Sequence, residues 1–109
     1  MRVAVIGGAG RMGKWLTEYL LNQGQEVFLS DARLEEAKAV ASSTGSELAK
    51  DNLEAVRGAD LVVVSTPIEI TPRVLKEITP ELRQSAAVVE ISSLKSQVIP
   101  VLEKIAKRG

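Results

Sequence analysis

Two kinds of apolar segment alternate along the chain. Short runs of β-branched residues are typical of strands buried on both faces, whereas apolar residues spaced by three and four positions predict amphipathic helices. The expected strands are Arg2–Ile6, Glu26–Ser30, Ser46–Ala49, Asp60–Ser65 and Ala86–Ile91. The expected helical segments are Arg11 to about Gln23, Asp31 to about Ser43, Leu53–Arg57, Thr71–Ile78 and Ser96–Lys107.

This alternation predicts an α/β protein. Because crossovers between parallel strands are right-handed, we expect a doubly wound parallel sheet with strand order 3-2-1-4-5. Thr71 is expected to cap the fourth helix, with Pro72 at its first position, where the missing N–H costs nothing. Trp15 and Tyr19 are expected to pack in the core or at its edge. Residues 1–109 have the length of one domain.

A glycine-rich turn joins the first strand to the first helix. It reads G-A-G-R-M-G, which is G-x-G-x-x-G in the strand-to-helix setting that the Rossmann dinucleotide motif requires. We expect Gly8 to allow the tight turn, Gly10 to let a pyrophosphate approach, and Gly13 to let the helix pack on the strand. Free N–H groups at the helix start would hold the phosphates; the alternative is a plain glycine-rich turn. The expected cofactor-binding residues here are Gly8, Ala9, Gly10, Arg11, Met12 and Gly13.

An acidic residue, Asp31, follows the second strand about 20 residues on, as the motif also requires. Its carboxylate is expected to accept hydrogen bonds from the adenosine ribose and to repel the 2′-phosphate of NADP. It could instead cap the following helix, and both roles can coexist. Ser30, Arg33 and Arg11 could form a cationic clamp for a 2′-phosphate. We therefore expect NAD as the cofactor, with NADP as the alternative.

Polar side chains also follow the fourth and fifth strands, near the point where a doubly wound sheet binds its ligand. The first set is Ser65, Thr66 and Pro67, which we expect under the ribose next to the nicotinamide. The alternative is an ordinary loop stiffened by proline. The second set is Ser92, Ser93 and Lys95, where a substrate could meet the cofactor. The alternative is that Ser93 or Ser96 caps the last helix and Lys95 is solvated.

Composition narrows the chemistry. Lys+Arg and Asp+Glu are both 14, and this balance gives no support for nucleic acid or an anionic membrane as a partner. Cysteine and histidine are absent, which removes thiolate metal sites and the usual general base. We expect no metal site. With no targeting or membrane segment visible, a cytoplasmic location is expected. Asp51 and Glu54 are expected on a solvated helix face.

The glycine turn, "VVVSTPIEITPRVLKEI" and "VVEISSLKSQVIPVLEKI" together resemble the cofactor-binding domain of prephenate dehydrogenases, especially the archaeal type. The resemblance covers essentially the whole chain. It implies an oxidoreductase that oxidatively decarboxylates prephenate to 4-hydroxyphenylpyruvate in tyrosine biosynthesis, with hydride passing to the nicotinamide. By this resemblance Ser93 is a catalytic residue, which hydrogen-bonds near the substrate hydroxyl and a catalytic histidine. Leu94 replaces the commoner valine of the motif.

In that family the histidine lies in a G-x-H-P-M-F-G-P segment after a sixth strand, and an all-helical dimerisation domain follows. Neither occurs in these 109 residues. We therefore expect the cofactor half of a longer, homodimeric enzyme, inactive by itself with prephenate. The alternatives are another reductase, such as a coenzyme F420-dependent NADP reductase or a β-hydroxyacid dehydrogenase, and a stand-alone NAD(P)-sensing module without catalysis.

Overall fold

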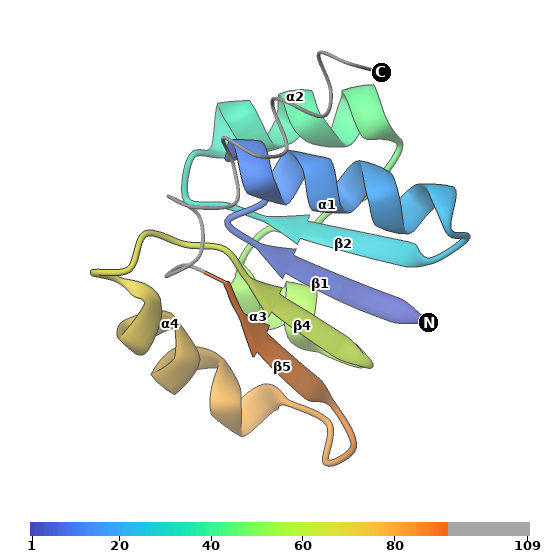
Figure 1. Ribbon diagram of the computed structural model, residues 1–109. Coiled ribbons are helices and arrows are strands. Elements are labelled where there is room, and N and C mark those ends of the chain that lie inside the picture. Colours follow the sequence, from blue (N-terminus) through green and yellow to red (C-terminus); the bar gives the residue numbers. More distant parts are fainter. Residues whose placement is uncertain (92–109) are drawn as a thin grey trace.

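The computed structural model describes residues 1–91, and the expected helix Ser96–Lys107 lies outside them (Figure 1). The strands are β1 Arg2–Ile6, β2 Glu26–Ser30, β3 Glu47–Leu48, β4 Leu61–Val64 and β5 Ala87–Glu90. The helices are α1 Arg11–Asn22, α2 Leu34–Thr44, α3 Asn52–Val56 and α4 Thr71–Ile78, followed by the 3-10 turn η1 Thr79–Glu81.

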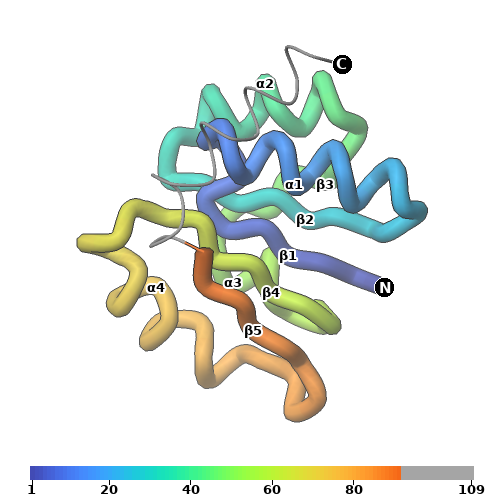
Figure 2. The backbone as a smooth tube through the Cα atoms, in the orientation of Figure 1, coloured from blue at the N-terminus to red at the C-terminus, as the bar shows by residue number. Residues whose placement is uncertain are grey.

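All strand pairs are parallel, and the sheet order is β3-β2-β1-β4-β5, which confirms the predicted topology. The central strand β1 runs between β2 and β4, as the tube in Figure 2 shows. Val3 lies opposite Val27 of β2 and Leu61 of β4. Because the chain crosses from one half of the sheet to the other after β3, the carboxyl ends of β1 and β4 border the point where a doubly wound sheet opens for a ligand.

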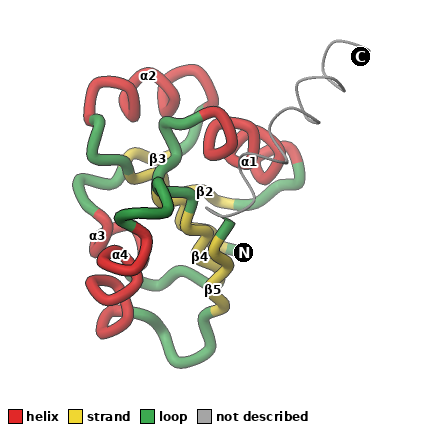
Figure 3. The backbone as a smooth tube through the Cα atoms, turned by 60° about the vertical axis from the view of Figure 1, so that its left-hand side comes forward, coloured by secondary structure: helices red, strands yellow, loops and turns green. Residues whose placement is uncertain are grey.

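Helices cover both faces of the sheet, as the turned view shows (Figure 3). On one face Val3 and Val5 of β1 pack with the apolar residues of α1, of which Leu16 is one. On the other face Ala4 and Ile6 pack with α3 and α4, where Ile78 is fully buried. Since successive residues of a strand point to opposite faces, β1 needs an unbroken apolar run, which is what the sequence provides.

The structure differs from the predictions in where α2 begins and in how α4 is capped; α3 also begins one residue earlier than predicted, at Asn52. Helix α2 begins at Leu34 rather than Asp31, because the Asp31 carboxylate accepts the Arg33 N–H at 2.9 Å and holds this stretch in a turn. Thr71 does not cap α4, since the helix begins at Thr71 itself and Ile70 occupies the N-cap. The Thr71 hydroxyl instead donates to the Pro67 carbonyl oxygen at 3.0 Å, which ties the helix start to the preceding loop.

The structure adds detail to two predictions about residues at or near the surface. Asp51 and Glu54 do more than face solvent: Asp51 accepts the Glu54 N–H at 2.8 Å, and Glu54 accepts the Lys50 N–H at 3.0 Å. Asp51 is therefore the N-cap of α3, and Glu54 reaches back to the residue before that cap. Trp15 and Tyr19 lie outside the buried core, as the edge alternative of the prediction allows, since 42% and 50% of their surfaces are exposed. Their rings stack on each other on the outside of α1, with centroids 5.5 Å apart.

Candidate coenzyme site

The glycine turn is fastened to the end of β2. The N–H groups of Gly7 and Gly8 both donate to the Ser30 carbonyl oxygen, at 2.8 and 3.2 Å. The left-handed conformation of this turn lies at Gly7, with φ of 82°, and not at Gly8 as the motif predicts. A Cβ atom at Gly7 would also lie 2.7 Å from the backbone of Ser65. Position 7 therefore requires glycine for two reasons: its backbone conformation is left-handed, and it leaves no room for a side chain next to Ser65.

The other glycines of the motif allow close packing. A Cβ on Gly8 would lie 1.5 Å from Leu29 Cδ1, so this residue presses against the buried side chain of β2. A Cβ on Gly13 would lie 2.5 Å from both the Gly7 oxygen and the Gly8 Cα. Gly13 thus lets α1 pack directly on the glycine turn, rather than on the strand that precedes it. At Gly10 a Cβ would lie 3.6 Å from Arg33 Nη2, an ordinary contact, and Gly10 itself lines a cavity.

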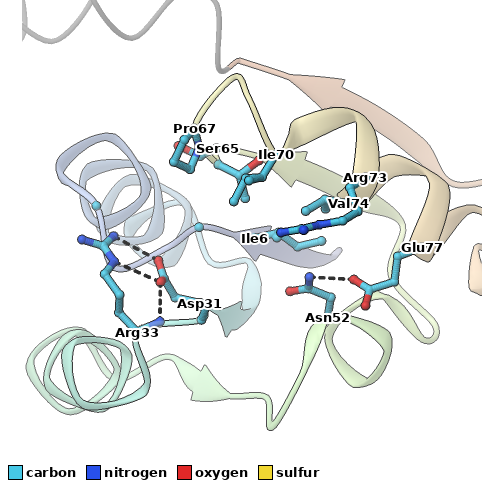
Figure 4. Close-up of a pocket in the computed structure, with 14 residues that line it drawn as sticks. Ile6, Asp31, Arg33, Asn52, Ser65, Pro67, Ile70, Arg73, Val74 and Glu77 are labelled. Atoms are coloured by element: carbon cyan, nitrogen blue, oxygen red, sulfur yellow. Dashed lines mark hydrogen bonds and ion pairs between the residues drawn. The ribbon is translucent and has the colours of Figure 1, made fainter.

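Asp31 connects the glycine turn with the approach to α2. Its side chain is only 6% exposed. One carboxylate oxygen accepts the Ala9 N–H at 3.0 Å and Arg33 Nη2 at 3.2 Å. The other accepts the Arg33 N–H at 2.9 Å and Arg33 Nε at 3.2 Å (Figure 4). Asp31 therefore makes no cap for α2, whose N-cap is Arg33 without a side-chain cap bond.

These hydrogen bonds keep Asp31 charged. Burial acts to raise the pKa of this carboxyl, but the hydrogen bonds from the Arg33 side chain and from the Arg33 and Ala9 N–H groups outweigh it and hold the pKa below its ordinary value. The same pairing raises the pKa of Arg33. A buried anion and a partly exposed cation consequently lie side by side where the motif places the adenosine ribose.

A cavity of about 570 Å³ opens at this edge of the sheet. That is the size of a small-molecule site. It lies between the glycine turn and Asp31 on one side and α4 on the other (Figure 4). The predicted site residues that line it are Gly10, Asp31, Arg33, Ser65, Thr66 and Pro67.

The remaining predicted residues do not line this cavity. Met12, Gly13 and Ser30 are buried, Gly8 and Ala9 belong to the turn, and Arg11 is the first residue of α1. Ser92, Ser93 and Lys95 lie outside the described residues.

Sequence reasoning missed the opposite wall of the cavity. The side chains of Ile70, Arg73, Val74 and Glu77 line it from α4 and its N-cap, and Asn52 lines it from the start of α3. The positions 70, 73, 74 and 77 follow helical spacing, so they share one face of α4. This spacing was visible in the sequence. The pattern alone could not say that this face lies opposite Asp31.

Ser65 carries an unfilled hydrogen-bonding group. The residue is 2% exposed, and its hydroxyl has no partner within residues 1–91. A buried hydroxyl normally has a partner, since leaving it unpaired costs free energy. Because Ser65 lines the cavity beside the glycine turn, a bound ligand could supply that partner. The orphan hydroxyl of Ser65, the glycine backbone at Gly10 and the buried Asp31 carboxylate all line one cavity, and this combination fits a dinucleotide.

Two other classes of site find no support in the described part of the chain. None of its helices is long and apolar enough to cross a membrane. Residues 1–91 also contain no cluster of acidic side chains that could hold a metal ion.

Comparison with known proteins agrees with this geometry. The family model described as "NADP oxidoreductase coenzyme F420-dependent" matches residues 2–93. The "Probable arogenate/prephenate dehydrogenase" of Methanocaldococcus jannaschii is 34% identical over all 109 residues, but the chain covers only 24% of that protein.

Solved structures share the fold. The arogenate dehydrogenase of Synechocystis superposes with a TM-score of 0.76 at 21% identity, over 83% of this chain and 32% of that one. The 3-hydroxyisobutyrate dehydrogenase of Mycobacterium tuberculosis gives 0.75 at 24% identity, over 82% and 30%. At these identities the two structures bear on the fold, which is that of the NAD(P)-binding domains of dehydrogenases.

Proposed function

The chain belongs to the family of coenzyme F420-dependent NADP oxidoreductases, and we propose that it is the coenzyme-binding domain of a prephenate or arogenate dehydrogenase. The observation that carries this proposal is the 34% identity to the Methanocaldococcus jannaschii relative, which runs through the whole chain. The match includes the segments after β4 and β5. The proposed reaction is the oxidative decarboxylation of prephenate or arogenate in tyrosine biosynthesis.

Each part of the site has a role in this proposal. The N–H groups at the start of α1 hold the pyrophosphate, supported by the positive end of the helix dipole. Asp31 holds the adenosine ribose, and the Ser65 hydroxyl gains its missing partner from the coenzyme. The bound coenzyme supplies the hydride acceptor. Ser93, by its place in the S-L-K segment, is proposed to act next to the substrate hydroxyl.

We propose NAD as the preferred coenzyme. The ionised, buried Asp31 carboxylate would repel a 2′-phosphate at the ribose. NADP is the second candidate, because the Arg33 guanidinium is more than half exposed beside the same ribose position and the matching family is described by NADP. The preference between NAD and NADP thus depends on two neighbouring residues of opposite charge, Asp31 and Arg33.

The rest of the enzyme is proposed to lie elsewhere in a longer polypeptide. The chain spans about a quarter of the length of its curated relatives, and no histidine occurs in its 109 residues. We propose that a further domain supplies the catalytic histidine, the substrate carboxylate site and the dimer contacts, and that the enzyme works in the cytoplasm. Residues 1–109 would then be one domain that binds coenzyme but does not turn over prephenate.

Calorimetric titration of the chain with NAD, NADH, NADP and NADPH tests coenzyme binding, and we expect binding of at least one pair. If a folded chain binds none of them at millimolar concentration, the proposal is wrong. Prephenate and arogenate are then supplied with the bound coenzyme to residues 1–109 and to the longest polypeptide that contains them. NADH should form only with the longer polypeptide. If that polypeptide instead reduces coenzyme F420 with NADPH, the protein is a coenzyme F420-dependent NADP reductase and not a prephenate dehydrogenase.

A further inference from the structure

A chain of side-chain hydrogen bonds runs beneath the cavity from β2 to α4. The buried Ser30 hydroxyl lies 2.7 Å from Asn52 Oδ1, and Asn52 Nδ2 donates to Glu77 Oε1 at 2.9 Å. The Ser30 bond orients the Asn52 amide, so that its nitrogen faces α4. The Glu77 carboxylate is thereby held at the edge of the cavity by one of its oxygens, which leaves the other free to accept a hydrogen bond from a ligand.

Arg73 lies one helical turn before Glu77. In Figure 4 its guanidinium extends from α4 back toward Ile6, across the cavity. It makes no hydrogen bond or ion pair with any of the described residues, although Glu77 is four positions away on the same helix. A planar, exposed cation with no partner among residues 1–91 thus lies near the apolar side chains of Ile6 and Val74.

The position of this wall indicates which part of a dinucleotide it meets. Asp31 marks the adenosine ribose, and the cavity continues from Asp31 across to α4. The group attached to that ribose is the base. Apolar side chains and a guanidinium plane suit the flat face of a purine. A carboxylate at the edge suits a hydrogen-bond donor on the ring, such as an amino group.

We propose that Arg73 and Glu77 recognise the base of the coenzyme and select adenine over a 6-oxo purine. Arg73 stacks on the face of the ring, and Glu77, positioned by Asn52, accepts a hydrogen bond from the 6-amino group. Hypoxanthine presents a carbonyl oxygen at the same place, where two acceptors repel each other. This inference rests on the proposed function, since it assumes that a dinucleotide occupies the cavity.

The test compares NAD with nicotinamide hypoxanthine dinucleotide by calorimetric titration; in the second compound a carbonyl oxygen replaces that amino group and the adjacent ring N1 carries a hydrogen. The wild-type chain should bind NAD at least about tenfold more tightly, the worth of one hydrogen bond to a charged group. Glu77→Gln should bring the two affinities within about threefold of each other, because an amide can also donate to a carbonyl oxygen. Arg73→Met should lower the affinity for both dinucleotides by the same factor, about three- to tenfold.

Lys76→Met, on the same helix but outside the cavity lining, is the matched control and should change neither affinity. Equal affinity of the wild-type chain for the two dinucleotides would overturn the inference and leave coenzyme binding intact. So would an unchanged affinity ratio in Glu77→Gln. If neither dinucleotide binds a chain whose far-ultraviolet circular dichroism shows it folded, the proposed function fails, and this inference fails with it.

Discussion

The Arg33 guanidinium donates two hydrogen bonds to the Asp31 carboxylate, from Nε to one oxygen and from Nη2 to the other, both at 3.2 Å. Together with the N–H groups of Ala9 and Arg33, each oxygen of Asp31 accepts two hydrogen bonds. A ribose hydroxyl must therefore take the place of an Arg33 contact, whereas a 2′-phosphate could draw Arg33 away from Asp31. We expect the competition between these two residues to set the coenzyme preference.

Replacing Asp31 with serine should shift this preference toward NADP. The change removes the repelling carboxylate and frees Arg33 for a phosphate. Since a hydrogen bond to a charged group is worth about 1.5–3 kcal/mol, we expect the NAD-to-NADP affinity ratio to fall by about ten- to a hundredfold. Titration with both coenzymes measures the ratio.

Asp60 provides the matched control for that experiment. Its carboxylate also accepts a backbone N–H, that of Arg2 at 2.8 Å, and pairs with Arg83 at 2.6 Å, but it lies outside the cavity. Asp60→Asn should therefore lower stability without changing the affinity ratio. A ratio that stays constant in Asp31→Ser as well would mean that Asp31 only organises the turn.

The stability of the chain should fall in acid. The pKa values of Asp31 and Asp60 both lie below the ordinary value, Asp31 because hydrogen bonds from Arg33 and Ala9 outweigh its burial, and Asp60 mainly because of the Arg2 N–H. Their stabilising effect is complete above the unfolded-state pKa, near 4, and is lost as the pH falls through the folded-state pKa. Urea unfolding between about pH 3 and 7 should show this loss. Asp31→Asn should be less stable at neutral pH and lose less on acidification; a slope equal to that of wild type would contradict the assignment.

Ser65→Ala should have opposite effects on stability and on binding. Removing a buried hydroxyl that lacks a partner should leave the free energy of unfolding unchanged or raise it by up to about 1 kcal/mol. If the coenzyme supplies that partner, its affinity should fall about three- to tenfold. Thr17, on the buried side of α1, also has a hydroxyl without a partner among residues 1–91. Thr17→Val should match the stability effect with no change in affinity, and equal affinities in the two variants would remove Ser65 from the site.

Gly13→Ala should disturb the turn itself. The added methyl group would meet the Gly7 oxygen and Gly8 Cα at 2.5 Å, so α1 and the turn must separate. We expect a loss of about 1–3 kcal/mol in unfolding free energy, together with weaker coenzyme binding. Gly24→Ala is the control: its φ of 79° costs about 1–2 kcal/mol, but nothing lies within 4 Å of the new methyl group. Denaturant unfolding and titration should show that only Gly13→Ala affects binding.

The sheet could be predicted because its strands carry their own signal. The β-branched runs of β1 and β4 are typical of strands that are buried on both faces. The alternation of strands with helices predicts a doubly wound parallel sheet. The start of α4 could not be read in the same way. Thr71 has the residue type of a cap, but its hydroxyl bonds the Pro67 carbonyl in a loop whose shape depends on β4 and α4 together.

In the candidate site, too, some residues could be predicted from a local sequence motif and others depend on tertiary packing. Residues 8–13 and Asp31 could be picked out by a local motif, but the hydrogen bond from the Ala9 N–H to Asp31 was not part of that prediction. Among adjacent glycines, however, the pattern could not tell that Gly7 carries the positive φ. Arg73 and Glu77 form no motif at all, because their role depends on which face of α4 the tertiary packing turns toward Asp31.

The close contact of Gly13 with the turn has a kinetic consequence. A turn clamped between a helix, the end of β2 and the backbone of Ser65 has little freedom left to lose when a ligand arrives. Preorganisation of this kind lowers the entropic penalty of association. Encounter with the pyrophosphate should then proceed at the rate of an ordinary diffusional docking step, and the exchange of Arg33 for a ribose hydroxyl should be the slower event that follows.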